Sequence, residues 1–427
     1  MADRQARGGT LILGGGFAGA WVARLIGRRG ATIVSRENFM LFASLLPEAA
    51  SGTLEPRHVV VPLRAMCPHA ELIVGSAVSH DLERRAVQVQ TEEELLTVDY
   101  QDLVVALGSI SRTLPVPGLA EHALGFKDLA DAIRLRNHVL RRLEAAAAAS
   151  APARRQRELT FVFVGAGYAG VEALAELSDL VRDAVRFYPE LRGERQRWVL
   201  VDAAPQILPE IPTRLGGYAA RQLSRRGVEI RISTTLERLE RHAATLSDSE
   251  RILTSTLVWT AGVRANPALA SFGLPLDGRG RVLVDSTLRV RGHEHVWALG
   301  DCAAVPNEAT PGHSDPPTSQ HALRQARRLA KNLAGEPQPY RYRMLGQVAT
   351  LGRYKGIAEV LGLRLYGFPG WFVTRTYHLY QLPLLSRKLR VVADWTVSLL
   401  FRRDIAVTPV AATSGPPHET PPEPPAA

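Results

Sequence analysis

The chain has 427 residues, of which 46% are hydrophobic and 22% charged, and its formal net charge is +10 at pH 7. This length predicts two or three domains that each bury a core, and two isolated cysteines, Cys67 and Cys302, argue against a disulfide scaffold, a metal site or a dithiol redox centre. The first residues contain no apolar signal segment and no uncharged apolar run reaches the ~18 residues of a membrane span, so we expect a cytoplasmic protein that can still lie on a membrane.

In chain order, residues 10–34 have the pattern of a strand, a glycine turn, a helix and a second strand, which is a βαβ unit. Residues 71–107 alternate and are β-branched, which predicts strands, and 128–148 predict a helix. The alanine-rich, basic stretch 144–158, which contains Pro152, predicts a solvated hinge at a domain crossing.

A second βαβ unit is predicted from strand 160–164, helix 168–186 and strand 197–202. Residues 295–301 read as a late strand of a sheet, and a helical stretch follows. The fold class is therefore α/β with two Rossmann-like domains. Residues 340–404 are aromatic and basic, and the final residues are rich in proline, which predicts disorder.

Each βαβ unit has a glycine-rich turn between its strand and its helix. In the first turn, Gly14 permits a tight turn, Gly16 lets the backbone approach a pyrophosphate, and Gly19 permits close packing of helix on sheet. The second turn repeats this spacing at Gly165, Gly167 and Gly170. One such match is weak evidence, because glycine turns also occur for packing alone, but two matches in the same context predict two dinucleotide sites.

The acid that follows each turn indicates which dinucleotide binds. Asp202 is placed to accept hydrogen bonds from a ribose 2′-hydroxyl, and no arginine follows it for a 2′-phosphate, which favours NADH over NADPH. After the first unit that acid is missing, and Ser35 or Glu37 is the candidate for the ribose contact. Asp301, at the end of an apolar strand, can bind the polyol chain of FAD, which assigns FAD to the first site. The alternative for Asp202 and Asp301 is an ordinary turn or capping aspartate.

The ordered motifs GGGFAG, ALGS, GAGYAGVEA, VWTAGV, VWALGD and PPTSQHALRQA resemble the two-dinucleotide-binding flavoproteins. More narrowly, they are similar to the type II NADH:quinone oxidoreductases, which are single-chain enzymes on the membrane surface. The resemblance runs from about residue 8 to about residue 407. It implies FAD contacts at Gly14, Gly16, Gly19, Gly108 and Asp301, and NADH contacts at Gly165, Gly167, Gly170, Asp202 and Gly262. It also implies an FAD-binding domain over 1–125 and 276–336, an NADH-binding domain over 126–275, and a C-terminal membrane-surface or dimerisation region over 337–408. The composition of the end of the chain predicts a disordered tail over 409–427.

The resemblance further implies the residues beside the flavin. Glu172 matches a family glutamate close to flavin and nicotinamide, and Gln320 matches a glutamine near the flavin and the quinone headgroup. Leu46 and Pro47 would lie near the acceptor pocket. The alternative for Glu172 is a carboxylate that pairs with a basic neighbour.

Two features narrow the acceptor chemistry. Ser319 and Arg324 replace an alanine and a second glutamine of the family's quinone-site signature, which leaves open whether the quinone is menaquinone or ubiquinone. The disulfide reductases and sulfide:quinone reductases of the superfamily rely on cysteines, and this chain has no cysteine pair. We therefore expect electrons to pass directly from flavin to the acceptor.

The segment 364–403 predicts contact with a bilayer. Pro383 divides it into two short interfacial helices whose aromatic side chains suit the headgroup depth and whose cations suit anionic lipid. These side chains are Trp371, Phe372, Tyr377, Tyr380, Trp395 and Phe401, with Arg375, Arg387, Lys388, Arg390, Arg402 and Arg403. The alternative is a packed dimerisation or capping region, which leaves a homodimer open, and the absence of a recognised module argues against nucleic acid.

The sequence therefore predicts a peripheral enzyme on the cytoplasmic face of the cell membrane that passes electrons from NADH through FAD to a quinone without pumping protons. Two other functions remain open. One is a soluble NADH-dependent flavin reductase that serves a ferredoxin-like protein or a small acceptor. The other is a non-catalytic flavoprotein redox sensor.

Overall fold

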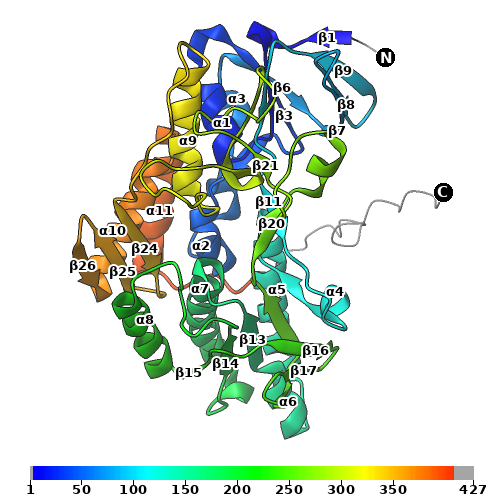
Figure 1. The fold of residues 1–427 in the computed structure, drawn as a ribbon. Coiled ribbons are helices and arrows are strands. Elements are labelled where there is room, and N and C mark those ends of the chain that lie inside the picture. The colour runs from blue at the N-terminus through cyan, green and yellow to red at the C-terminus, as the bar shows by residue number, and fades with distance from the viewer. Residues whose placement is uncertain (1–2, 408–427) are drawn as a thin grey trace, which may run out of the picture.

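The computed structural model describes residues 3–407, and the predicted tail over 409–427 lies outside that range. The first Rossmann-like domain is built on a five-stranded parallel sheet (Figure 1). Its strands, in spatial order, are β22 (Val296–Ala298), β10 (Asp102–Val105), β2 (Thr10–Leu13), β3 (Ala31–Ser35) and β6 (Ala70–Val74). This confirms the first βαβ unit and the late strand. The strands of this sheet are short, and every residue of β3 is buried, as expected for a parallel sheet covered on both faces.

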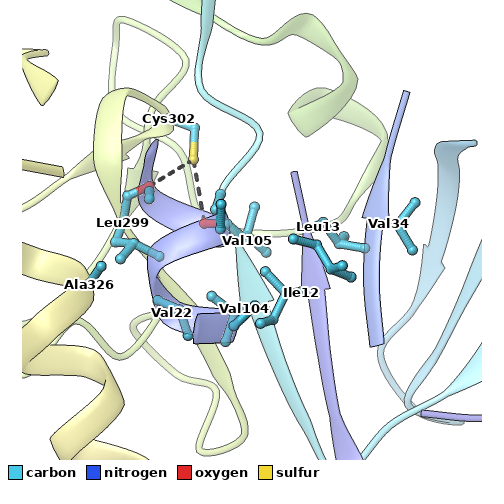
Figure 2. Packing of buried hydrophobic residues seen from close by; sticks show 14 of the residues in the cluster. Ile12, Leu13, Val22, Val34, Val104, Val105, Leu299, Cys302 and Ala326 are labelled. Carbon is cyan, nitrogen blue, oxygen red and sulfur yellow. Dashed lines mark hydrogen bonds between the residues drawn. The ribbon is translucent and has the colours of Figure 1, made fainter. Parts of the chain in front are cut away.

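Helices α1 (Phe17–Leu25) and α9 (Ser319–Asn332) pack together on this sheet. Figure 2 shows the shared core, in which Val22 of α1 lies beside Val104 and Ile12 of the strands and Ala326 of α9 lies near Leu299. Cys302 is part of this core, where its thiol donates to the carbonyl oxygens of Val105 at 3.5 Å and Leu299 at 3.3 Å. Burial raises the pKa of this thiol to about 11, so it is an inert apolar residue rather than a redox group.

The second domain repeats the architecture in the lower half of the molecule (Figure 1). Its parallel sheet has the order β12 (Leu124–Gly125), β19 (Thr256–Trp259), β13 (Thr160–Val164), β14 (Arg197–Val201) and β15 (Val228–Arg231). Its helices are α5 (Leu129–Ala147), α6 (Pro152–Glu158), α7 (Tyr168–Ala184) and α8 (Thr213–Arg225). The second predicted βαβ unit is therefore confirmed.

Smaller elements complete the two domains. A mixed sheet joins β1 (Asp3–Gln5), β9 (Leu95–Asp99), β8 (Ala86–Gln90) and β7 (Ser76–Asp81), in which β1 runs parallel to β9 and the other pairs are antiparallel. An antiparallel sheet joins β16 (Leu236–Glu240), β17 (Ala243–Leu246) and β18 (Arg251–Leu253). The remaining short pieces are β4 (Phe39–Leu41), α2 (Leu46–Ala50), β5 (Val60–Pro62), α3 (Leu63–Met66), α4 (Leu119–His122), β21 (Val282–Leu283) and β23 (Ala303–Ala304). Between the two halves, β11 (Ser109–Ser111) pairs antiparallel with β20 (Val263–Ala265) (Figure 1).

The predicted hinge at 144–158 is wrong, because this stretch is mostly helical. Helix α5 continues to Ala147, and α6 begins at Pro152, which suits the first turn of a helix. Its basic residues are held by the protein rather than by solvent: Arg155 bonds the Ala149 carbonyl at 2.8 Å and pairs with Glu194 at 2.9 Å.

The C-terminal region forms an antiparallel sheet and two helices. The strands are β24 (Gly346–Thr350), β25 (Gly356–Val360) and β26 (Leu363–Tyr366), and the helices are α10 (Gly367–Gln381) and α11 (Leu385–Leu400). The two predicted helices, separated at Pro383, are confirmed. Within residues 3–407, no helix is long and apolar enough to cross a membrane.

Two of the six cations that we expected to face lipid are instead buried. Arg375 pairs with Glu48 at 3.0 Å, and Arg403 pairs with Glu176 at 2.9 Å. Trp371 is buried too, since the Arg375 guanidinium stacks on its ring at 4.3 Å. The prediction was wrong for these residues because the sequence does not show which side chains have distant acidic partners.

Candidate active site

One cavity of about 1660 Å³ joins the two domains. Eight predicted site residues line it: Gly14, Gly16, Leu46, Pro47, Gly108, Glu172, Asp301 and Gln320. The other predicted residues do not line this cavity, namely Gly19, Ser35, Gly165, Gly167, Gly170, Asp202 and Gly262. The cavity therefore brings the first glycine turn, the proposed acceptor residues and Glu172 into one space.

The first glycine turn has the shape that a pyrophosphate requires. Gly14 adopts a φ of +112°, and a Cβ added to Gly19 would fall 1.9 Å from the Gly14 carbonyl oxygen, so helix α1 contacts its own turn directly. A Cβ added to Gly16, by contrast, would meet no protein atom within 4 Å. That open space in front of a helix N-terminus, whose first amides have no intrahelical partner, fits the pyrophosphate of FAD.

The second turn has the same construction. Gly165 adopts a φ of +111°, and a Cβ added to Gly170 would fall 1.8 Å from the Gly165 carbonyl oxygen. Asp202 accepts from the backbone amides of Ala166 and, at 2.7 Å, Ala204. Its carboxylate thus holds the turn in place at the end of β14, as the capping alternative expects, and the ribose contact stays a prediction.

The two ribose candidates of the first unit differ in position. Ser35 is buried behind the glycine turn, whereas Glu37 lines the cavity with its neighbour Arg36. Of the two, only Glu37 is placed to contact a bound nucleotide.

Asp301 is held for a polyol contact by a residue that the sequence did not single out. Its carboxylate accepts from the Ser109 hydroxyl at 2.6 Å, and that hydroxyl also accepts from Lys127 at 3.1 Å. All three residues line the cavity. Ser109 is the last residue of the ALGS motif and follows a strand, so the sequence could have indicated it as a site residue. Nothing in the sequence indicates such a role for Lys127.

Glu172 lies in the first turns of α7 and is 8% exposed. Its carboxylate accepts from the backbone amide of Thr350 on β24 at 2.8 Å and from the Thr350 hydroxyl at 3.2 Å. Burial raises the pKa of Glu172 to about 8, with added repulsion from Glu48 and Glu176, and the Thr350 hydrogen bonds oppose that rise. Within residues 3–407 it forms no ion pair, so the alternative of a carboxylate with a basic partner is not what the structure shows.

Gln320 and His378 approach the cavity from the other side. Gln320, in the first turn of α9, donates to the Gly346 carbonyl oxygen at 3.4 Å and accepts from the Tyr342 hydroxyl at 3.5 Å. His378 of α10 also lines the cavity, and burial lowers its pKa to about 4, so its imidazole is neutral. Sequence reasoning missed His378, because it read that segment as facing lipid only.

The fold and its two glycine turns define a two-dinucleotide-binding oxidoreductase, and the chain matches the pyridine nucleotide-disulphide oxidoreductase family over residues 9–326. It is 30% identical to a type II NADH:quinone oxidoreductase from Mycobacterium tuberculosis, over 94% of this chain and 90% of that protein. It is also 30% identical to a probable NADH dehydrogenase from Dictyostelium discoideum, over 88% of this chain and 85% of that protein. The structure of NDH2 from Plasmodium falciparum in complex with NADH has the same fold, with a TM-score of 0.86 and 17% identity over 94% of this chain and 99% of that one. Within the wider family, the chain belongs to the type II NADH:quinone oxidoreductases.

Alanine substitutions at Gly16 and Gly19 of the first turn should affect different properties of the protein, namely FAD binding and stability. Gly19→Ala forces a Cβ against the Gly14 carbonyl oxygen, so we expect a lower melting temperature of the flavin-free protein. Gly16→Ala has room in the protein and should fold normally, but its methyl group occupies the space of the pyrophosphate and should weaken FAD binding about tenfold or more. Flavin absorbance per chain and thermal unfolding of the flavin-free proteins measure both, and a Gly16→Ala protein that retains a full complement of FAD would contradict the assignment.

Proposed function

We propose that this chain oxidises NADH at the second glycine turn and reduces a quinone beside Leu46, Pro47 and Gln320, with FAD held at the first turn. As a type II NADH:quinone oxidoreductase it is an FAD-dependent enzyme of the respiratory chain. The observation that carries the proposal is the single cavity that joins the first turn, Glu172 and the acceptor residues. When bound, FAD supplies the means to take up a hydride from NADH and to give two electrons to the acceptor.

The residues of the chain hold and orient the reactants. Gly14 and Gly16 receive the FAD pyrophosphate, and Asp301, fixed by Ser109, accepts from its polyol chain. On the other side, Asp202 is the proposed ribose acceptor for NADH. Gln320 presents an amide to the acceptor region and His378 presents a neutral imidazole, so both can hydrogen-bond a quinone oxygen.

Reduction of a quinone also consumes two protons, and we assign the supply of one to Glu172. Because its pKa lies at about 8, its carboxyl group carries a proton at pH 7 while it lies inside the cavity. An ordinary glutamate would be ionised there and could not donate.

The surface of α10 and α11 supports a membrane location. An unusual number of large apolar side chains are exposed on these helices, including Leu400 at 77% and Tyr380 at 74%. The others are Phe368, Phe372, Leu385, Leu389, Val392, Val397, Leu399 and, just after α11, Phe401. Arg387, Lys388, Arg390 and Arg402 accompany them. A soluble monomer rarely exposes so much apolar surface together, and apolar residues beside cations suit anionic lipid.

We propose that the enzyme is a peripheral protein at the cytoplasmic face of the membrane, and the exposed apolar surface supports the contact with lipid. The same surface could pair two copies of the chain, and a homodimer is the second proposed partner. The exposed helices favour a lipid-soluble acceptor over a ferredoxin-like protein, because a protein that serves a soluble partner has no use for this apolar surface. The cavity favours catalysis over the redox-sensor alternative, because it holds Glu172, an acid with a raised pKa, together with the acceptor residues.

The half-reactions test the function directly. Anaerobic addition of NADH to the purified holoenzyme should bleach the flavin absorbance rapidly, and a short-chain quinone added next should restore it. The measurement is stopped-flow absorbance. Slow bleaching would favour the redox sensor, whereas rapid bleaching without recovery in quinone would favour a reductase for another acceptor.

Glu172→Gln should alter the pH dependence of quinone reduction. The raised pKa means that the proton is present below about pH 8 and lost above it, so the rate of flavin reoxidation in the wild-type enzyme should fall as pH rises through that value. Glutamine cannot donate, so the variant should be slower at pH 7 by roughly 10²-fold and should lack this limb. Bleaching by NADH serves as the internal control. A variant with the wild-type profile would refute the assignment.

Exposed apolar residues of α10 and α11 should govern binding to lipid. Phe372→Ser together with Leu400→Ser should weaken sedimentation with phosphatidylglycerol vesicles about tenfold or more, because the variant loses two exposed apolar side chains that would enter the lipid. The matched control is Phe187→Ser with Leu253→Ser, which are similarly exposed on the second domain. Loss of a dimer in the first variant with unchanged vesicle binding would identify the surface as a homodimer interface instead.

A further inference from the structure

Helix α7 carries a row of four buried acids. Glu172, Glu176, Asp179 and Asp183 are spaced by four, three and four residues, which places them on one face of the helix. All are nearly inaccessible, at 8%, 1%, 1% and 8% exposure. Four carboxylates so close together repel one another, so the row depends on cations from elsewhere in the chain.

Three of the four acids have an arginine partner. Arg226 of the loop after α8 pairs with Asp179 at 2.5 Å. Arg403 pairs with Glu176 at 2.9 Å and with Asp183 at 3.2 Å. Glu172, the acid that lines the cavity, is the member of the row without an ion pair within residues 3–407.

Arg403 belongs to the segment that follows α11. Leu400 and Phe401 are 77% and 65% exposed, yet Arg403 is only 7% exposed, so the chain turns from the surface into the protein within three residues. The return is fixed on both sides: Arg403 donates to the Thr53 hydroxyl at 3.0 Å, and Arg136 of α5 donates to the carbonyl oxygens of Asp404 at 2.6 Å and Ala406 at 2.8 Å.

A second arginine ties the same end of α11 to the acid row. Arg353 donates from its guanidinium to the Ser398 carbonyl oxygen at 2.5 Å, and its backbone amide donates to Asp179 at 2.7 Å. The exposed C-terminal end of α11 is therefore connected to α7 through both Arg353 and Arg403.

We propose that Arg403 is a positioning residue for the active-site acid: it compensates Glu176 and thereby sets the protonation of Glu172, and it connects this setting to the lipid-facing end of α11. The inference rests on the proposed role of Glu172 as a proton donor. Arg403 itself does not line the cavity, so it acts through Glu176, which lies one helical turn from Glu172.

The charged and titratable groups around Glu172 fix the direction of the effect. Thr350 of β24 stabilises the charged form of Glu172 by two hydrogen bonds. Glu48 of α2 and Glu176 of α7 disfavour that charged form, and the neighbouring Tyr168 contributes no positive charge. Glu48 has its own cation in Arg375 of α10. When Arg403 is removed, Glu176 becomes an uncompensated anion, which favours the neutral form of Glu172 and raises its pKa.

The test measures the pH dependence of flavin reoxidation by a short-chain quinone in the full-length holoenzyme on phosphatidylglycerol vesicles. In Arg403→Met we expect the falling limb to move to higher pH, by on the order of one unit, because a nearby like charge favours the neutral form of Glu172. Arg403→Lys should restore most of the wild-type profile, because it keeps the charge. Arg403→Met with Glu176→Gln should also return the limb toward its wild-type position, because it removes the uncompensated acid.

Two further variants keep the test decisive if Arg403→Met does not fold. Glu176→Gln alone leaves Arg403 in place and should move the limb in the opposite direction, to lower pH. The matched control is Arg402→Met, which removes the same charge from an exposed neighbouring position and should leave the limb unmoved even if vesicle binding weakens. Bleaching by NADH should be unchanged in every variant.

The outcomes separate this inference from the function on which it rests. If Glu172→Gln retains the limb, the proton-donor role of Glu172 fails. If Glu172→Gln abolishes the limb but neither Arg403→Met nor Glu176→Gln moves it in a folded, flavin-loaded protein, only the role of Arg403 is overturned.

Discussion

The direct contact between each helix N-terminus and the glycine turn before it determines how the rest of the molecule is arranged. On α7 the backbone of Gly170 lies so close to the Gly165 carbonyl oxygen that no side chain fits between them. The helix is thus fixed in position and rotation against β13. Glu172 follows two residues later, so this contact alone decides that its side chain reaches the cavity. The same contact at Gly14 and Gly19 fixes α1 beneath the FAD site.

A helix fixed in this way can carry buried charge where a mobile one could not. Burying a carboxylate is costly unless a cation and hydrogen bonds compensate it, and a compensated pair adds little net stability. Arg182 of α7 itself pairs with Asp179, but Arg226 and Arg403 come from distant parts of the chain, and Arg403 ties the row of acids to the C-terminal region. Glu172 differs from the other three acids of the row because it forms no ion pair within residues 3–407. With hydrogen bonds from Thr350 but no cation partner in the described part of the chain, its carboxyl group has a raised pKa, whereas the other acids of the row are held by arginines.

Local features of the sequence predicted the fold well, because they act locally. A buried strand followed by spaced glycines and an apolar helix face specifies a βαβ unit with little help from the rest of the chain, and both units were found. Features that depend on distant partners were missed. The segment 144–158 was read as a hinge, because its arginines looked solvated until Glu194 and the Ala149 carbonyl oxygen provided partners. Arg375 and Arg403 looked like lipid contacts for the same reason, and Ser35 occupied the right position in the sequence but lies behind the turn.

The two C-terminal helices are joined to the catalytic region through one buried acid, Glu48. On α10, Arg375 lies between the rings of Trp371 and Trp395 and pairs with Glu48, which directly follows Pro47 of the acceptor region. The indole of Trp395 on α11 donates to the same carboxylate at 2.6 Å, so one buried acid holds both helices. Their outward surfaces are apolar, while their inward contacts end on acids that adjoin the cavity wall. Tyr377 and His378 of α10 line the cavity, so the helix that we propose to lie at the bilayer also contributes to the wall of the pocket in which a quinone would be reduced.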